Sequence, residues 1–99
     1  MFENKRFCTA GIQAKVPIVI QMVLWNLVDS MEVRRRDYLQ VFRLSEENGK
    51  QKIVHSQEIP DYKMEYSVSP DNTGTEPITV KIYIIDDGDH TTMLLAEEY

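Results

Sequence analysis

The sequence of 99 residues has few of the residues that staple small proteins together or that prevent a core from forming. Its single cysteine, Cys8, cannot form an internal disulfide, so the chain fits a reducing cytoplasm. Four glycines and four prolines exclude collagen-like and low-complexity proteins. Because 42% of the residues are hydrophobic, we expect residues 1–99 to fold as one domain without a disulfide or a metal.

Long apolar runs are also absent. The most apolar segment, residues 16–28, contains Pro17, Gln21 and Asn26, whereas a membrane-spanning helix needs about 20 apolar residues. The apolar stretch that follows Arg6 is too short and too interrupted for a signal peptide. We therefore expect a cytoplasmic protein that does not enter a membrane.

Positive charge is scarce, with 11 Lys and Arg against 16 Asp and Glu and a net charge of -5. Such a balance disfavours binding to nucleic acid or to an anionic membrane, and the one basic run, residues 34–36, is shorter than a typical nucleic-acid patch. The acidic residues are concentrated after residue 56. This asymmetry indicates either a partner-binding face or two halves that fold against each other with a solvated surface.

An amphipathic pattern predicts one main helix over residues 17–31. Pro17 suits the first turn, and apolar residues recur at the steps of three and four that line one helical face. The apolar surface is wider than a helix on a single sheet needs, since Met22 and Trp25 lie outside the main stripe. Either the sheet curls around the helix or a second copy of the chain covers the excess. We place Met22 and Trp25 at such an interaction surface, because Met and Trp are enriched at interface cores.

The rest of the chain is dominated by strand signals. Asn48-Gly49 and Asp87-Gly88 are typical of tight hairpin turns, and Pro60 ends a strand. The expected strands cover residues 6–9, 38–44, 51–57, 62–68, 78–84 and 91–96. This order predicts an α+β fold, an antiparallel sheet of about five or six strands with one main N-terminal helix packed on one face.

One acidic segment could bind a metal ion. Asp86, Asp87, Asp89 and His90 group oxygen and imidazole ligands within five residues, which is chemically compatible with a hard or borderline cation. The spacing does not match an EF-hand loop, and an acidic hairpin turn is the favoured interpretation. We expect no metal and no cofactor.

Catalytic signals are weak. A nucleophile would have to come from Cys8 with His55, a pair that needs hydrogen-bond contact in space. His55 and Glu58 belong to a polar run, residues 55–58, that could line a groove or could simply pair with neighbouring backbone and tyrosine hydroxyls. If these residues form a site, His55 is the proton-transfer group. The chain has no glycine-rich phosphate loop and no nucleophile elbow.

Several segments together resemble a family of small proteins of Gram-positive bacteria that is catalogued only as a domain of unknown function. The most specific are Tyr-Leu-Gln-Val-Phe at residues 38–42 and His-Ser-Gln-Glu at residues 55–58, with Leu24-Trp25 and Pro60 in support. The resemblance covers nearly the whole chain. It implies a single intact domain in a bacterial cytoplasm, and it implies no activity.

These observations favour a non-enzymatic protein–protein interaction module over an enzyme. The expected partner is an unidentified protein, and self-association into a homodimer is the simplest form of such an interaction. The alternative is a small enzyme or ligand-binding domain with a polar site around His55.

Overall fold

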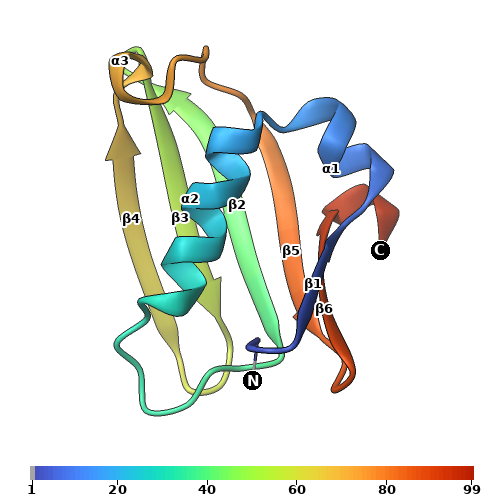
Figure 1. The fold of residues 1–99 in the computed structure, drawn as a ribbon. Helices are drawn as coiled ribbons and strands as arrows, with labels where there is room; N and C mark the ends of the chain where they lie inside the picture. Colours follow the sequence, from blue (N-terminus) through green and yellow to red (C-terminus); the bar gives the residue numbers. More distant parts are fainter. Residues whose placement is uncertain (1) are drawn as a thin grey trace.

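The computed structural model describes residues 2–99 (Figure 1). The strands are β1 (Lys5–Cys8), β2 (Leu39–Glu47), β3 (Lys50–Gln57), β4 (Tyr62–Val68), β5 (Val80–Asp86) and β6 (His90–Leu95). The helices are α1 (Ala10–Lys15), α2 (Ile18–Asp29), α3 (Pro70–Thr73) and the 3-10 turn η1 (Ala96–Glu98). The strands form one sheet in the order β1-β6-β5-β2-β3-β4. The expected α+β class is confirmed.

Hairpin turns connect the antiparallel strands where the sequence predicts them. Asn48 and Gly49 both have positive φ between β2 and β3, and Gly88 has a φ of 100° between β5 and β6. The outermost pair differs from the prediction, because β1 runs parallel to β6, with Arg6 opposite Thr91. The sheet is therefore mixed. This parallel pair joins the first strand to the last. Turn residues predict only pairing between strands that are neighbours in sequence, so they could not predict it.

Helix α2 packs across one face of the sheet (Figure 1). Its inward residues Ile20, Leu24 and Val28 are at most 1% exposed, and they belong to one core cluster with residues of the four central strands. The strand residues in that cluster are Phe42, Leu44, Ile53, Ile82, Ile84, Met93 and Leu95. The predicted helix over residues 17–31 is confirmed to within two residues at its C-terminal end.

Helix α1 begins at Ala10-Gly11, a pair whose residue types predict only a turn. The Thr9 side chain caps it by accepting a hydrogen bond from the Ile12 backbone N–H, and Ile12 is fully buried. Six residues are too few to show a helical period, so the sequence pattern gives no sign of this element.

The two faces of the sheet differ in exposure. Strand residues that point toward α2 are mostly buried, whereas those that point away from it are all partly or fully exposed. We call this second surface the open face. Within residues 2–99, no helix is long and apolar enough to cross a membrane.

Candidate interaction surface and buried polar groups

The outward side of α2 carries an apolar stripe. Ile18, Met22 and Trp25 follow each other at steps of four and three, which places them on one side of the helix. Ile18 is 71% exposed and Met22 is 64% exposed, so the helix leaves large apolar side chains in water after its opposite side has packed on the sheet. We call these three residues the α2 stripe. It contains both residues that the sequence assigned to an interaction surface.

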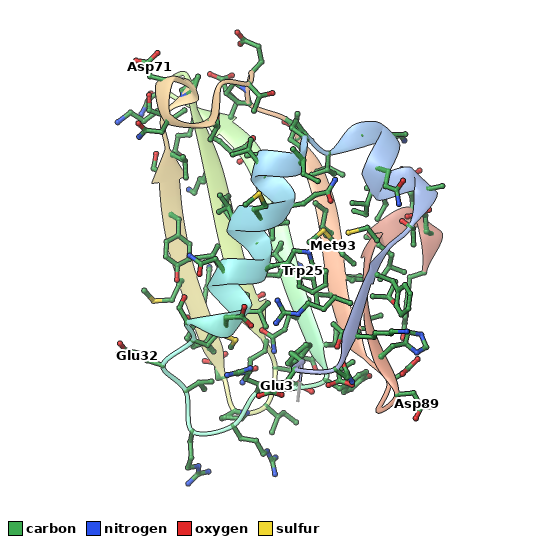
Figure 2. The ribbon with its side chains drawn as sticks, in the orientation of Figure 1. Glu3, Trp25, Glu32, Asp71, Asp89 and Met93 are labelled. Carbon is green, nitrogen blue, oxygen red and sulfur yellow. The ribbon has the colours of Figure 1, made fainter. Side chains whose placement is uncertain are left out.

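A shallow hollow of about 580 Å³ lies beside the stripe. Its apolar lining comes from α2, and its polar rim is formed by Arg6, Asn26 and Asp29. Figure 2 shows Trp25 on the side of α2 that faces β1. The Arg6 guanidinium lies 4.8 Å from the centre of the Trp25 ring, a cation–π contact that holds the ring against the N-terminal strand.

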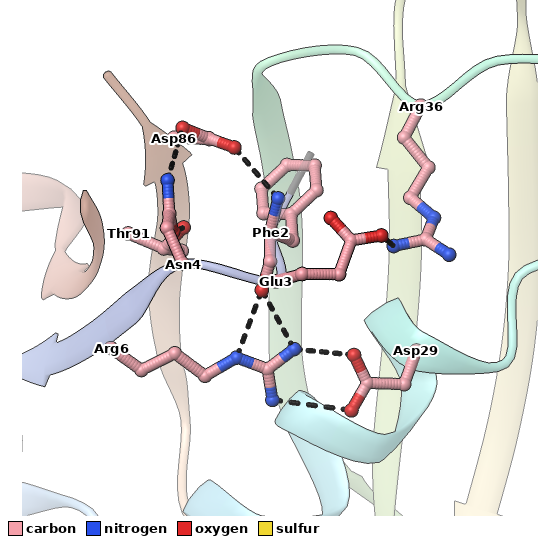
Figure 3. A network of polar contacts seen from close by, with 8 residues as sticks. All are labelled: Phe2, Glu3, Asn4, Arg6, Asp29, Arg36, Asp86 and Thr91. Atoms are coloured by element: carbon pink, nitrogen blue, oxygen red, sulfur yellow. Dashed lines mark hydrogen bonds and ion pairs between the residues drawn. The ribbon is translucent and has the colours of Figure 1, made fainter. Parts of the chain in front are cut away.

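Arg6 also ties the N-terminal segment to α2 (Figure 3). Its guanidinium forms a two-pronged ion pair with Asp29 and donates to the Phe2 carbonyl at 3.0 and 3.1 Å. Phe2 itself is fully buried in the core. The rim of the hollow is therefore held by contacts between β1 and the end of α2.

Asp86, a metal candidate, is occupied by structural hydrogen bonds. Its carboxylate accepts from the backbone N–H of Phe2 at 2.7 Å, from Gly88 N–H at 2.8 Å and from the Asn4 amide at 3.1 Å (Figure 3). Burial raises the pKa of Asp86, but these donors outweigh burial and the pKa lies below its usual value. This carboxylate fastens the N-terminal segment to the end of β5.

The other metal candidates shape the β5–β6 turn. The Asp87 carboxylate accepts from the backbone N–H groups of Asp89 and His90, and the His90 ring nitrogen Nε2 lies 3.1 Å from it. The Asp89 side chain is exposed. Among residues 2–99, no three histidine, cysteine or acidic side chains converge on a position for a metal ion.

His55 is fully buried between aromatic rings. It stacks on Phe42 with ring centres 4.2 Å apart, and the Tyr62 ring meets its edge at 5.3 Å. Burial lowers the pKa of His55 to about 4, so the ring is neutral at pH 7. A neutral ring without solvent access is poorly placed to exchange protons with a substrate.

A chain of buried glutamines holds the His55 ring. The Gln40 amide nitrogen donates to the Asp37 carbonyl and, at 2.7 Å, to the Gln57 side-chain oxygen. The Gln40 oxygen is left to accept from His55 Nε2 at 2.7 Å, so Nε2 carries the proton and Nδ1 does not. No described residue bonds to Nδ1. Alternation in the sequence puts His55 and Gln57 on the same face of their strand, but it gives no sign that this face is the buried one.

The catalytic candidates are not brought together. Cys8 lies on β1 and donates to the Gln21 side-chain oxygen at 3.5 Å, and burial raises the pKa of its thiol. Three strands separate β1 from β3, which places Cys8 roughly 19 Å from His55 at 4.8 Å per strand. Glu58 follows β3, is exposed and lines a hollow on the open face. The three side chains thus lie in three different places.

A family model described as "Staphylococcal protein of unknown function" (DUF960) matches residues 5–98. The chain belongs to this family. The chain is similar in structure to a protein of unknown function from Enterococcus faecalis, known from a crystal structure, with a TM-score of 0.79. The two chains are 24% identical, and the match covers 98% of this chain and 92% of the other.

At this sequence identity, the structural similarity shows that the two proteins share the fold and shows nothing further. No curated protein matches the sequence of this chain. The family match and the Enterococcus faecalis structure together confirm the resemblance to a Gram-positive family of unknown function.

Proposed function

We propose that this DUF960 protein is a non-enzymatic interaction module that binds a protein partner through the α2 stripe. The observation that carries the proposal is the exposure of Ile18 and Met22 on a helix whose other side is fully packed. Covering one such side chain contributes about 1.5 to 3 kcal/mol. The single cysteine supports a cytoplasmic setting for this interaction.

The hollow beside the stripe supports the same surface. Its lining is largely apolar, and Met22 adds an adaptable side chain that can fit a partner of irregular shape. An enzyme centred on His55 has less support, because that side chain is 0% exposed and its ring is neutral at pH 7. A second copy of the chain is one candidate for the partner.

The test uses a double substitution on the stripe. Ile18→Ser with Met22→Ser removes exposed apolar surface without touching the core, so folding should be retained. A tagged wild-type protein should capture a defined partner from a lysate of the source organism, and the double variant should lose it. Ile59→Ser is the matched control, because Ile59 is 66% exposed but lies in the β3–β4 turn.

Sedimentation of the purified protein at tens of micromolar distinguishes a second copy of the chain from a different protein as the partner. A wild-type dimer that becomes a monomer in the stripe variant identifies a second copy. A monomeric wild type that captures the same proteins as the stripe variant would contradict the proposal.

A further inference from the structure

The open face is basic, although the chain as a whole is acidic. The charged strand residues that point to this face are Lys5, Arg43, Lys50, Lys52, Lys63 and Lys81 on the positive side and Glu47 and Glu65 on the negative side. Most of the acidic residues of the chain lie instead in turns, loops and helix ends. This separation places a concentration of positive charge on one surface.

Both carboxylates of the open face pair with the same lysine. Lys52 Nζ lies 3.1 Å from Glu47 and 3.3 Å from Glu65, and these bonds raise the pKa of Lys52. The other cations of this face have no ion-pair partner among the described residues. The positive charge of the face is therefore largely uncompensated.

Two of these cations stand directly opposite each other. Arg43 on β2 pairs in register with Lys81 on β5, and both side chains are exposed. Like charges in this position destabilise a sheet. Lys81 lies over the ring of Tyr83, 5.4 Å from its centre, which keeps its charge on the open face. An anionic group bound between Arg43 and Lys81 would convert this repulsion into attraction.

An apolar band lies beside the pair. The next two opposed pairs on the open face of β2 and β5 are Val41–Tyr83 and Leu39–Ile85. Leu94 on β6 lies opposite Tyr83. A hollow of about 250 Å³, large enough to accept a side chain, adjoins the pair. Its lining includes Leu39, Val41, Arg43 and Ser56, together with the carboxylates of Asp37 and Glu58. The face thus offers apolar contacts and positive charge side by side.

We propose that the open face binds an acidic polypeptide segment, with carboxylates at Arg43 and Lys81 and aliphatic side chains on the neighbouring band. This surface is separate from the α2 stripe, and the proposal does not depend on the proposed function. The charge of the face selects an anionic ligand, and the aliphatic character of the band selects a polypeptide.

A single-stranded nucleic acid fits the same face less well. Such ligands stack successive bases on several free aromatic rings. Here Tyr83 is covered by Lys81 and meets Tyr99, and Phe7 meets His90, while the exposed Tyr38 at the hollow is a single ring. A long polyanion or an anionic membrane would also extend past the face toward the acidic remainder of the chain. A short acidic segment avoids that repulsion.

The experiment is an NMR titration of the ¹⁵N-labelled full chain with a short synthetic peptide of glutamate and leucine. Amide shifts should change along β2 and β5, and the apparent Kd should rise with salt because the interaction is partly electrostatic. Arg43→Gln with Lys81→Gln should weaken binding by about tenfold, the loss expected from two charged contacts.

Arg34→Gln with Arg35→Gln is the matched control, because it makes the same change in net charge on exposed residues of the α2–β2 connection. It should leave peptide affinity within about twofold of the wild type. A lysine–leucine peptide should not bind. Thermal melts of both double variants verify that each is folded.

Three results would overturn the proposal: no shift changes at millimolar peptide, equal weakening by the two double variants, or shift changes confined to α2. Tighter binding to an oligothymidine or to phosphatidylglycerol vesicles, lost in the Arg43/Lys81 variant, would assign the face to nucleic acid or membrane instead. None of these results bears on capture of a partner by the α2 stripe, so the two proposals fail separately.

Discussion

His55 shows how a residue with the chemistry of a catalyst can serve the core instead. Its ring is enclosed by Phe42 and Tyr62, and its one hydrogen bond ends in the Gln40–Gln57 chain. That chain ends on backbone groups, because Gln57 donates to the Arg35 and Pro60 carbonyls. These contacts join the α2–β2 connection to the turn after β3.

The buried state of His55 predicts a loss of stability in mild acid. Its pKa is about 4 in the folded chain and about 6.5 when unfolded, so the unfolded chain binds the proton more tightly. The neutral His55 ring therefore makes its full contribution to stability above pH 6.5, and this contribution is lost as the pH falls from 6.5 toward 4. Between pH 7 and pH 4.5 we expect the free energy of unfolding to fall by about 2 to 3 kcal/mol.

Urea denaturation at a series of pH values measures this effect. The variant His55→Gln removes the titrating group and can still donate to Gln40, so its stability should vary much less over the same range. Ile18→Ser is the control, because Ile18 is 71% exposed and carries no titrating group, so this variant should keep the pH dependence of the wild type. A pH profile that is identical in wild type and His55→Gln would contradict the assignment.

Individual elements were predictable from the sequence to different degrees. The α2 period and the β5 alternation reflect local burial, so helix and strand could be located without the structure. The pairing of β1 with β6 could not, because it joins residues more than 80 positions apart. Helix α1 was hidden by its length and by Gly11, where a Cβ atom would lie 2.6 Å from a carboxylate oxygen of Glu98. This approach of the Glu98 carboxylate to Gly11 is a long-range contact that the local sequence pattern does not show.

The Arg43–Lys81 pair on the open face predicts a stabilising substitution. Arg43→Glu places a carboxylate opposite Lys81 and replaces repulsion with attraction, while the Lys81–Tyr83 contact remains. The free energy of unfolding should rise by about 0.2 to 1 kcal/mol. Such a gain would show that the native pair is retained at a cost in stability, as expected for a binding surface.

Lys50→Glu tests the same rule with the opposite sign. Lys50 stands opposite Glu47 in the β2–β3 register, so this substitution creates a like-charge pair and should lower stability by a similar amount. Chemical denaturation of both variants at low salt, repeated at ~1 M salt, should show the two differences shrink together. Equal shifts of the same sign would indicate an effect of net charge alone.

At the scale of the whole molecule, charge along the chain and charge in space follow different patterns. The acidic second half of the sequence contributes Lys63 and Lys81 to the basic open face, because β4 and β5 flank β3 and β2 in the sheet. The order of strands therefore mixes the two halves. The candidate residues Met22 and Trp25 could be identified from the sequence, because their positions on the surface follow from the period of one helix. The Arg43–Lys81 pair could not, because it follows from the register between two strands that are not neighbours in sequence.

The fold predicts that its two exposed surfaces act independently. The α2 stripe lies on the outer side of the helix layer, and the Arg43–Lys81 pair lies on the opposite face of the sheet, so no side chain contacts both. Substitutions at distant sites without shared partners have additive effects. Ile18→Ser with Met22→Ser should therefore leave the affinity for the glutamate–leucine peptide within about twofold, and Arg43→Gln with Lys81→Gln should leave partner capture intact. The quadruple variant should show both losses, each of the size seen alone. A stripe variant that weakens peptide binding beyond that margin, while its thermal melt is unchanged, would show that the sheet couples the two surfaces.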